Sequence, residues 1–287
     1  MSSENPLVSV VCLCYNHEHF IRKSVESVLN QSYKNIEVII VDDCSTDNSR
    51  QVIQDIVEEY PQVKILLLDE NIGNTKAFNK GLALSSGDFI IDLATDDILL
   101  EDRVKIGVEE FEKYDDSYGV NFSNAINIDQ DGNVINYHYS VDAEGNAITK
   151  PPQGDLYKEL IQKYFICSPT MMVKRSVFEK LNGYDESLAY EDFDFWVRSA
   201  RYFNYCYTDK VLVQRRRIKN SMSALQYGYR SNQMESTYIV CCKIKNLNKS
   251  LEENKALQIR IYYELKQCIK YFNFSLIGKY FKLYLGI

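Results

Sequence analysis

Two pairs of adjacent aspartates, Asp42-Asp43 and Asp96-Asp97, each follow a short apolar run in the first hundred residues. Adjacent carboxylates repel each other, so a divalent cation bound there would relieve that repulsion and would find the oxygen ligands it prefers. Aspartate is equally suited to capping a helix, and Asp96-Asp97 taken alone fits either interpretation. The predicted strands and helices around the pairs are therefore needed to distinguish a binding site from a helix cap.

A third acidic cluster lies near residue 190, where Glu191, Asp192 and Asp194 alternate with aromatic residues up to Trp196, the single tryptophan. A carboxylate of this kind suits general-base catalysis, in which it takes a proton from a hydroxyl group. One of the three acids can equally cap the helix that follows, and the aromatic side chains belong more often to a core than to a sugar platform. The cluster is thus a candidate base with a structural alternative.

Short apolar, β-branched runs alternate with helical stripes through this part of the chain, which predicts four strands separated by three helices. The expected strands are 7–13, 36–41, 63–68 and the run from Phe89, and the expected helices follow apolar positions in 21–31, 52–57 and 76–84. This order predicts a parallel sheet with right-handed crossovers and helices on both faces. The carboxyl ends of its strands share one edge, where ligands bind in such sheets, so Tyr15-Asn16 and both aspartate pairs should converge there. Convergence favours a binding site over capping.

The second half of the chain predicts a less regular order of elements. Helices are expected at 101–114, 156–165 and 175–181, a hairpin at 120–128 and 134–138, short strands at 170–173 and 211–213, and a helical tail from about 233. The polar segment 140–153 contains Gly145 and Pro151-Pro152 and is predicted to be a loop.

The composition, 45% hydrophobic and 25% charged, is that of an ordinary globular protein, and 287 residues suit one large domain or two modest ones. A net charge of −7 argues against nucleic acid as a partner, which needs a basic surface. No secretory signal precedes Leu7 and no CxxC pair has zinc spacing, so the eight cysteines are expected to be reduced in a cytoplasmic protein. No apolar run is long enough to span a bilayer, so any membrane contact should be peripheral.

The charge is unevenly distributed, because residues 240–287 hold nine lysines and arginines against three acids. Helical spacing predicts one apolar face formed by Ile261, Leu265, Cys268, Ile269, Phe272 and Leu276, with Arg260, Glu264, Gln267 and Lys270 elsewhere. Residues 233–287 are therefore predicted to be a basic amphipathic helical tail. Two roles remain open for it: packing on the rest of the protein or on a second copy, and contact with an anionic membrane near a lipid-linked acceptor.

A set of motifs in fixed order connects these features to a known family. VSVVCLCYN, SVLNQSY and IEVIIVDDCSTDNS come first, and NIGN, GLALSSGDFI, the diacidic turn, SPTMMVKRSVFEKLNGYDE and EDFDFW follow. The set resembles the family 2 inverting glycosyltransferases, which have the GT-A fold, up to about Ser223. The resemblance implies an α/β, Rossmann-like, mostly parallel central sheet with helices on both faces in residues 1–232. A nucleotide-sugar-binding half would occupy about 6–114 and an acceptor half about 115–232, with 233–287 as a C-terminal helical extension.

The resemblance also implies roles for five residues at matching positions. Tyr15 would lie against the nucleotide base, and Asp43 would accept a hydrogen bond from that base, which in this family is often uracil. Asp96 would contact the ribose and the metal region, Asp97 would ligate Mn²⁺ or Mg²⁺, and Asp192 would be the catalytic base. The implied activity is transfer of a sugar, with inversion, from a nucleoside diphosphate donor, expected to be a UDP-sugar, to a glycan or lipid-linked acceptor. The expected setting is cell-surface polysaccharide biosynthesis in the cytoplasm or at the inner face of the membrane.

The chain departs from the family pattern at two places. Ala94 stands where an acid is commoner, which leaves Asp96 and Asp97 as the only acids on the metal side. Many members have a histidine near position 218 that assists the diphosphate, and this chain has none there; the positive charge would come from Arg215, Arg216, Arg217 or Lys219. The candidate contacts with phosphate or acceptor are Glu191, Trp196, Arg216 and Lys76, although Lys76 is as readily explained as a solvated lysine at a helix start.

Two alternatives from other classes remain. A catalytically inactive glycan-binding or scaffold protein could keep the same fold, and Ala94 is the residue that suggests it. A sugar-phosphate nucleotidyltransferase would need a glycine-rich triphosphate loop after the first strand, and CLCYNHEHF contains no glycine. His17 and His19 are close in sequence but lack a third zinc ligand, so a solvated loop or a helix start explains them better.

Overall fold

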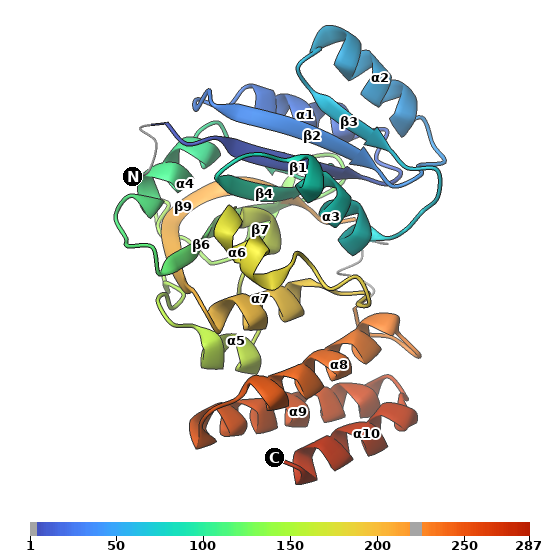
Figure 1. The fold of residues 1–287 in the computed structure, drawn as a ribbon, viewed down its shortest axis with the longest axis vertical. Helices are drawn as coiled ribbons and strands as arrows, with labels where there is room; N and C mark the ends of the chain where they lie inside the picture. Colours follow the sequence, from blue (N-terminus) through green and yellow to red (C-terminus); the bar gives the residue numbers. More distant parts are fainter. Residues whose placement is uncertain (1–4, 219–225) are drawn as a thin grey trace. The chain divides into compact units, whose positions relative to one another are not determined.

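The computed structural model describes residues 5–218 and 226–287, which belong to two compact units (Figure 1). The first unit takes Met1–Gly154, Ile166–Tyr184 and Phe203–Arg217, and the second takes Asp155–Phe165, Asp185–Tyr202 and Ile218–Ile287. The second unit thus combines the tail with two segments that precede residue 232 in the sequence. The division of function at residue 232 stays a prediction.

Nine strands of the first unit, counted over the described residues, form one sheet in the order β3-β2-β1-β4-β8-β6-β9-β5, with β7 beside β6 (Figure 1). They are β1 Val8–Cys14, β2 Ile36–Asp42, β3 Lys64–Leu67, β4 Phe89–Ala94, β5 Ile98–Leu99, β6 Tyr118–Ile128, β7 Val134–Tyr137, β8 Met172–Lys174 and β9 Asn204–Arg216. The first four run parallel, as the alternation of apolar runs and helical stripes predicts. β8 is antiparallel to β4 and to β6, and β6 is parallel to β9.

Helices cover both faces of the parallel strands, which explains why every residue of β1 is buried. They are α1 Ile21–Leu29, α2 Ser49–Glu59, α3 Asn74–Leu84, α4 Arg103–Phe111 and α6 Arg175–Leu181. Successive strand residues point to opposite faces, and Val10 packs in one core cluster with Val25 of α1 and Ile53 of α2. On the other face α3 approaches so closely that a Cβ at Gly81 would lie 2.5 Å from Val11. The predicted fold class is confirmed.

The predicted elements of the second half differ from the structure mainly around β9. The expected short strand at 211–213 lies in the second half of a thirteen-residue strand, and the two-residue β5 that pairs with it has no counterpart among the predictions. β9 carries polar residues such as Thr208, Asp209 and Lys210 in its middle, so it lacks the continuous apolar run that marks β1 or β4. It forms because β6 supplies a long parallel partner.

The second unit contains five helices within the described residues: α5 Tyr157–Gln162, α7 Asp192–Ala200, α8 Asn232–Leu247, α9 Leu251–Lys270 and α10 Phe274–Leu285. The predicted apolar face of α9 is wrong in part. Arg260 and Glu264 are 2% and 1% exposed, whereas Ile269 and Phe272 are largely exposed. The charged pair is buried because its members bond to each other, with Arg260 Nη1 3.1 Å from Glu264 Oε1.

Arg260 also connects the tail to the helices that come earlier in the chain. Its Nε donates to the main-chain oxygen of Ile161 at 2.9 Å, and its guanidinium lies 3.9 Å from the ring centre of Tyr164 and 4.8 Å from that of Phe193. Phe193 is in the first turn of α7, directly after Asp192. The tail therefore packs on α7, the helix that carries the candidate base. For the face of α9 that carries Arg260, the role is packing on the rest of the protein.

Arg260→Ala is expected to lower the free energy of unfolding by about 3–5 kcal/mol, because it leaves Glu264 buried without its partner. Thermal and urea denaturation of the full chain measure this loss. The double variant Arg260→Met/Glu264→Met removes both charges at similar volume and should recover most of it. A single variant as stable as the wild type would show that the pair contributes nothing to the second unit.

Candidate functional site

The ends of three neighbouring strands of the first unit meet at one edge of the sheet, as predicted. β1 lies between β2 and β4, with Cys14 opposite Asp42 and Leu13 opposite Ala94. The pairing continues beyond the strands, since Asp43 N donates to Cys14 O and Thr95 N donates to Leu13 O, each at 2.9 Å. The residues that follow β1, β2 and β4 therefore line one rim, as in open α/β sheets that bind ligands there.

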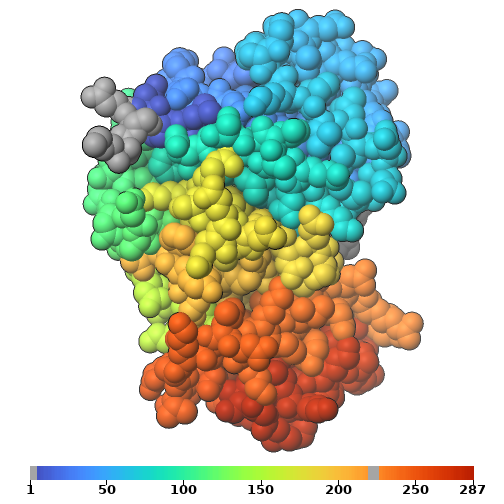
Figure 2. Space-filling model, viewed as in Figure 1, coloured from blue at the N-terminus to red at the C-terminus, as the bar shows by residue number. Residues whose placement is uncertain are grey.

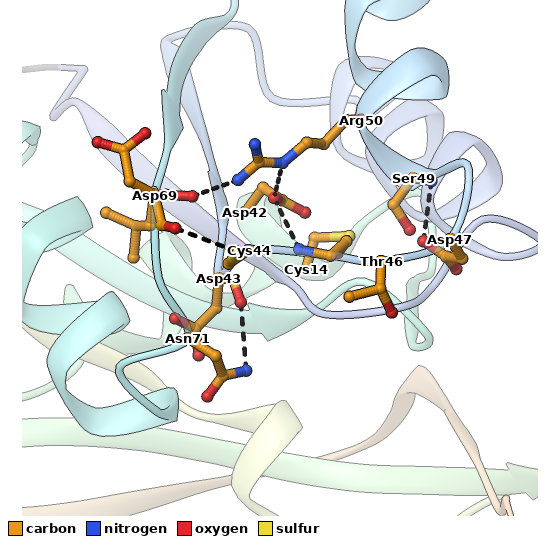
Figure 3. A network of polar contacts seen from close by, with 12 residues as sticks. Cys14, Asp42, Asp43, Cys44, Thr46, Asp47, Ser49, Arg50, Asp69 and Asn71 are labelled. Atoms are coloured by element: carbon orange, nitrogen blue, oxygen red, sulfur yellow. Dashed lines mark hydrogen bonds and ion pairs between the residues drawn. The ribbon is translucent and has the colours of Figure 1, made fainter.

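The two aspartates of the first pair, Asp42 and Asp43, have different hydrogen-bond partners and different roles (Figure 3). Asp42 is fully buried, and its carboxylate bonds to Arg50 Nε at 2.8 Å and to Ser45 N at 3.0 Å, so its role is structural. Asp43 accepts the main-chain N–H groups of Ile72 at 2.8 Å and Gly73 at 2.9 Å, which fixes the loop that begins α3. A carboxylate has about four acceptor positions, so Asp43 can still accept a bond from a base.

Two residues at this rim hold left-handed backbone conformations without being glycine. Asn16 follows β1 with φ 58°, and Cys44 follows β2 with φ 61°. The Asn16 side-chain oxygen accepts Thr46 N at 2.7 Å, and Ser45 Oγ accepts Asn16 N at 2.9 Å, so the two strand ends hold each other. Such conformations cost free energy, and they gather where the position of a backbone matters for binding.

The second aspartate pair has carboxylate oxygens that accept no hydrogen bond from the described residues. Asp97 is 3% exposed, and its Oδ1 accepts Arg216 N at 2.7 Å. Burial, and then repulsion by Asp96, raise the pKa of Asp97 well above its usual range, although the Arg216 N–H and the charges of Arg215 and Arg216 oppose this. The Asp96 carboxylate is half-buried and has no hydrogen-bond or ionic partner within residues 5–218 and 226–287.

Tyr15 and Lys76 are accessible at the same rim. Tyr15 directly follows β1, is 46% exposed and makes no ring contact with any described residue. Lys76 is exposed in the first turn of α3, three residues beyond the Gly73 N–H that Asp43 holds. Their predicted contacts with base and phosphate stay predictions, and neither side chain is committed to the core.

Arg216 has a structural position behind the second aspartate pair. Its Nε donates to Asp96 O at 3.0 Å, its Nη1 donates to Asp129 O and Gln130 O, and its guanidinium lies 4.6 Å from the ring centre of Phe20. These bonds tie the turn after β4 to the hairpin turn after β6. The phosphate role predicted for Arg216 stays a prediction.

The two arginines beside Arg216 differ in whether their side chains have a hydrogen-bond partner. Arg215 is half-buried, and its side chain has no partner among the residues that the structure describes, so it is the better-placed source of positive charge near Asp97. The Arg217 side chain donates to Asn127 Oδ1 at 3.2 Å. Lys219, the other cation considered, lies outside the described residues.

His17 is a rim residue whose role the sequence interpretation missed. A solvated loop or a helix start is the prediction for it, and His17 O does accept Phe20 N and Ile21 N where α1 begins. Its side chain is half-buried, however, with its Nδ1 2.9 Å from Thr95 Oγ1. Its main-chain N–H donates to Ser49 Oγ at 2.9 Å, which links the end of β1 to α2. His17 thus fastens the segment Thr95–Asp97 to the end of β1. A contact between residues 78 positions apart leaves no local signal in a sequence.

In the second unit the acidic cluster opens α7. Asp194 is 1% exposed and is held by Arg198 at 2.6 Å and Lys243 at 2.7 Å, so it serves the fold. Glu191 and Trp196 are 7% and 2% exposed, and the Trp196 ring packs edge-on against Tyr164. Asp192 is the one half-buried acid of the three. The acceptor contacts predicted for Glu191 and Trp196 stay predictions, and burial makes them the weakest of the set.

Within the described ranges, no group of three or more histidine, cysteine or acidic side chains is arranged to hold a metal ion. A two-carboxylate site nevertheless fits Mn²⁺ or Mg²⁺, because such ions take part of their oxygen ligands from substrate phosphates and water. Among the described residues the Asp96 carboxylate and one oxygen of Asp97 have no partner, and the pKa of Asp97 is raised by burial and then by repulsion from Asp96, a repulsion that a cation would remove. The rim residues therefore fit a metal ion whose remaining coordination positions are filled by a bound ligand and water.

The order of this sheet, with Tyr15-Asn16 after β1 and an aspartate pair at the ends of β2 and β4, is that of the GT-A fold. The chain matches glycosyl transferase family 2 over residues 9–182. It is 30% identical over 204 residues to an uncharacterized glycosyltransferase of Methanocaldococcus jannaschii, covering 68% of this chain and 65% of that one. It is 29% identical over 212 residues to chondroitin synthase of Escherichia coli, covering 73% and 29%. The chain thus spans less than two thirds of the length of these relatives.

Two solved structures share the fold. TarS residues 1–349 of S. aureus, in complex with UDP-GlcNAc, superpose with a TM-score of 0.69 at 20% identity, covering 92% of this chain and 73% of that one. A mannosyltransferase from Pyrobaculum calidifontis, in complex with GDP-Man and Mn²⁺, gives a TM-score of 0.62 at 14% identity, covering 99% and 87%. The chain belongs to glycosyl transferase family 2.

Proposed function

We propose that the chain is a metal-dependent, inverting hexosyltransferase that moves a sugar from a nucleoside diphosphate, expected to be UDP, to a hydroxyl group of a glycan or lipid-linked acceptor. The observation that carries this proposal is the set of uncommitted groups at the rim. The Tyr15 ring, the Asp96 carboxylate and one Asp97 oxygen have no partner in the described part of the first unit. They match the aromatic, ribose and cation contacts that a nucleotide sugar needs.

The roles of the donor-side residues follow from their surroundings. Tyr15 would stack on the base, and Asp43 would accept a hydrogen bond from it with a position not used by Ile72 or Gly73. Asp96 and Asp97 would hold Mn²⁺ or Mg²⁺, which when bound supplies positive charge for the departing diphosphate. Arg215 would add to that charge from β9.

The transfer itself would be a single displacement. Asp192 would take the proton of the acceptor hydroxyl while that oxygen forms its bond to the anomeric carbon. The bond from that carbon to the diphosphate oxygen breaks in the same step, so the configuration inverts and no covalent enzyme intermediate forms.

The setting we propose is polysaccharide biosynthesis in the cytoplasm. Its support is that E. coli chondroitin synthase is a relative and that TarS, solved with UDP-GlcNAc, shares the fold. An inactive glycan-binding protein is the weaker alternative, since Asp43, Asp96, Asp97 and Asp192 are all present. Membership of family 2 sets the nucleotidyltransferase alternative aside.

A donor screen tests this function. The chain is incubated with UDP-, GDP- and dTDP-sugars, each with Mn²⁺, with Mg²⁺ and with EDTA, and release of nucleoside diphosphate is measured. We expect release from a UDP-sugar that EDTA abolishes. No release from any donor would favour the inactive alternative, and release unaffected by EDTA would remove the metal from the proposal.

A further inference from the structure

Several large apolar side chains of α9 and α10, the orange-red to red part of the chain in Figure 2, are exposed. A groove of about 590 Å³ lies between the two helices and is lined by Lys255, Gln258, Ile259, Tyr262, Leu265, Phe281 and Tyr284. Ile259, Tyr262 and Phe281 are 52%, 60% and 58% exposed. Scattered exposed apolar residues are ordinary, but a continuous patch of this kind marks a docking surface.

Lysines accompany these side chains on the same helix face. Lys255, Ile259, Tyr262, Lys266 and Lys270 follow one another at intervals of three or four residues, so they lie along one side of α9. Lys266 Nζ lies 4.3 Å from the ring centre of Tyr262, which shows that basic and aromatic groups are intermixed there.

The one exposed acid on the two helices is Glu252, in the first turn of α9. From residue 254 onward the one acidic side chain is Glu264, which is buried against Arg260. The exposed basic groups from that point are Lys255, Lys266, Lys270, Lys279 and Lys282, of which Lys279 bonds to Glu235 of α8. Beyond the first turn of α9, the patch therefore presents apolar and aromatic groups together with exposed lysines and no exposed acid of the same two helices.

The positive charge of this face distinguishes between two partners that could cover it, a second copy of the chain and an anionic lipid surface. A second copy would form an isologous contact, in which the same patch meets itself and lysines oppose lysines. An anionic lipid surface instead complements the lysines, takes up the apolar side chains at the acyl boundary and suits tyrosine at the headgroup level. No helix in the described ranges is long and apolar enough to cross a membrane, so the contact would be along the surface.

We propose that the α9–α10 face, defined by Lys255, Ile259, Tyr262, Lys266, Phe281 and Lys282, binds an anionic membrane surface. The lysines contact lipid headgroups, and the apolar side chains insert at the edge of the acyl layer. This inference adds a partner to the proposed function and rests on it only for the idea of a lipid-linked acceptor. Vesicle binding is measured without donor or acceptor, so it stands or fails apart from sugar transfer.

Co-sedimentation of the full chain with vesicles tests the proposal. We expect pelleting with vesicles that contain phosphatidylglycerol, weak pelleting with phosphatidylcholine alone, and loss of binding in about 0.5 M salt. Lys266→Glu/Lys282→Glu should lower the partition coefficient at least about tenfold, and Tyr262→Ser/Phe281→Ser should do the same. Matched controls are Lys105→Glu on α4 and Val134→Ser/Ile135→Ser on β7, exposed positions that should leave binding unchanged.

Three outcomes would overturn it. The first is a wild-type chain that does not pellet, and the second is equal pelleting with neutral and anionic vesicles. A concentration-dependent dimer in sedimentation velocity that Tyr262→Ser/Phe281→Ser dissociates would assign the face to a second copy. Circular dichroism melting of each variant shows whether a loss of binding comes from unfolding.

Discussion

Asp192→Asn is expected to lower kcat about 10³-fold, with little change in nucleotide binding or melting temperature. The reason is that asparagine keeps the shape of the side chain but cannot take the acceptor proton. Asp192 is the half-buried acid of its cluster, whereas Asp194 is 1% exposed and forms ion pairs with Arg198 and Lys243. Steady-state transfer assays, together with a nucleotide titration, measure the two effects separately.

The neighbouring acid provides a matched comparison for this result. Asp194→Asn breaks buried ion pairs with Arg198 and Lys243, so it should lower the melting temperature while the folded fraction keeps most of its kcat. Glu252→Gln, an exposed acid at the start of α9, should change neither quantity. If Asp192→Asn retained full turnover while Asp194→Asn lost it in the folded state, the base would have to be reassigned to Asp194.

Asp97→Asn is expected to reduce kcat/KM about 10²–10³-fold and to abolish its dependence on Mn²⁺ concentration. Asparagine can still accept the Arg216 N–H through its oxygen, so the turn after β4 should keep its geometry. It also removes a buried charge that burial and Asp96 disfavour, so the melting temperature without metal should be unchanged or higher. Activity at a series of Mn²⁺ concentrations and a thermal melt measure these effects.

A nearby acid controls for the general effect of losing a negative charge. Asp102→Asn, at an exposed position just before α4, can still accept the Ser32 hydroxyl through its side-chain oxygen and should keep the Mn²⁺ dependence of the wild type. An Asp97→Asn enzyme that remained fully active and metal-dependent would leave Asp96 as the main ligand. A large drop in melting temperature would instead show that the Asp97 charge serves the fold.

The donor half of the fold was predictable because its signals are local. The apolar runs of β1, β2 and β4 indicate strands buried on both faces. Because the carboxyl ends of parallel strands share one edge of the sheet, the polar residues after these runs are expected to lie together. Tyr15, Asp43, Asp96 and Asp97 could therefore be placed at one rim from the order of motifs. Their ligand roles come from resemblance and remain to be tested.

The features that were missed depend on partners distant in sequence. Arg260 and Glu264 look like surface residues in a helical pattern, and only packing against Tyr164 and Phe193 shows that they are buried. The bond between His17 and Thr95 is equally invisible until β1 and β4 lie side by side. Arg216 was a candidate for phosphate because of its charge, and the carbonyl groups that it binds lie in two separate turns.

The most direct measurement of the central claim is calorimetric titration of UDP into the wild-type chain with and without Mn²⁺. A metal completed by Asp96, Asp97 and the diphosphate predicts binding that strengthens at least about tenfold when Mn²⁺ is present. Equal affinity with and without the ion would contradict the metal site. No binding of UDP under either condition, with GDP and dTDP also failing to bind, would contradict the nucleotide-sugar site at this rim altogether.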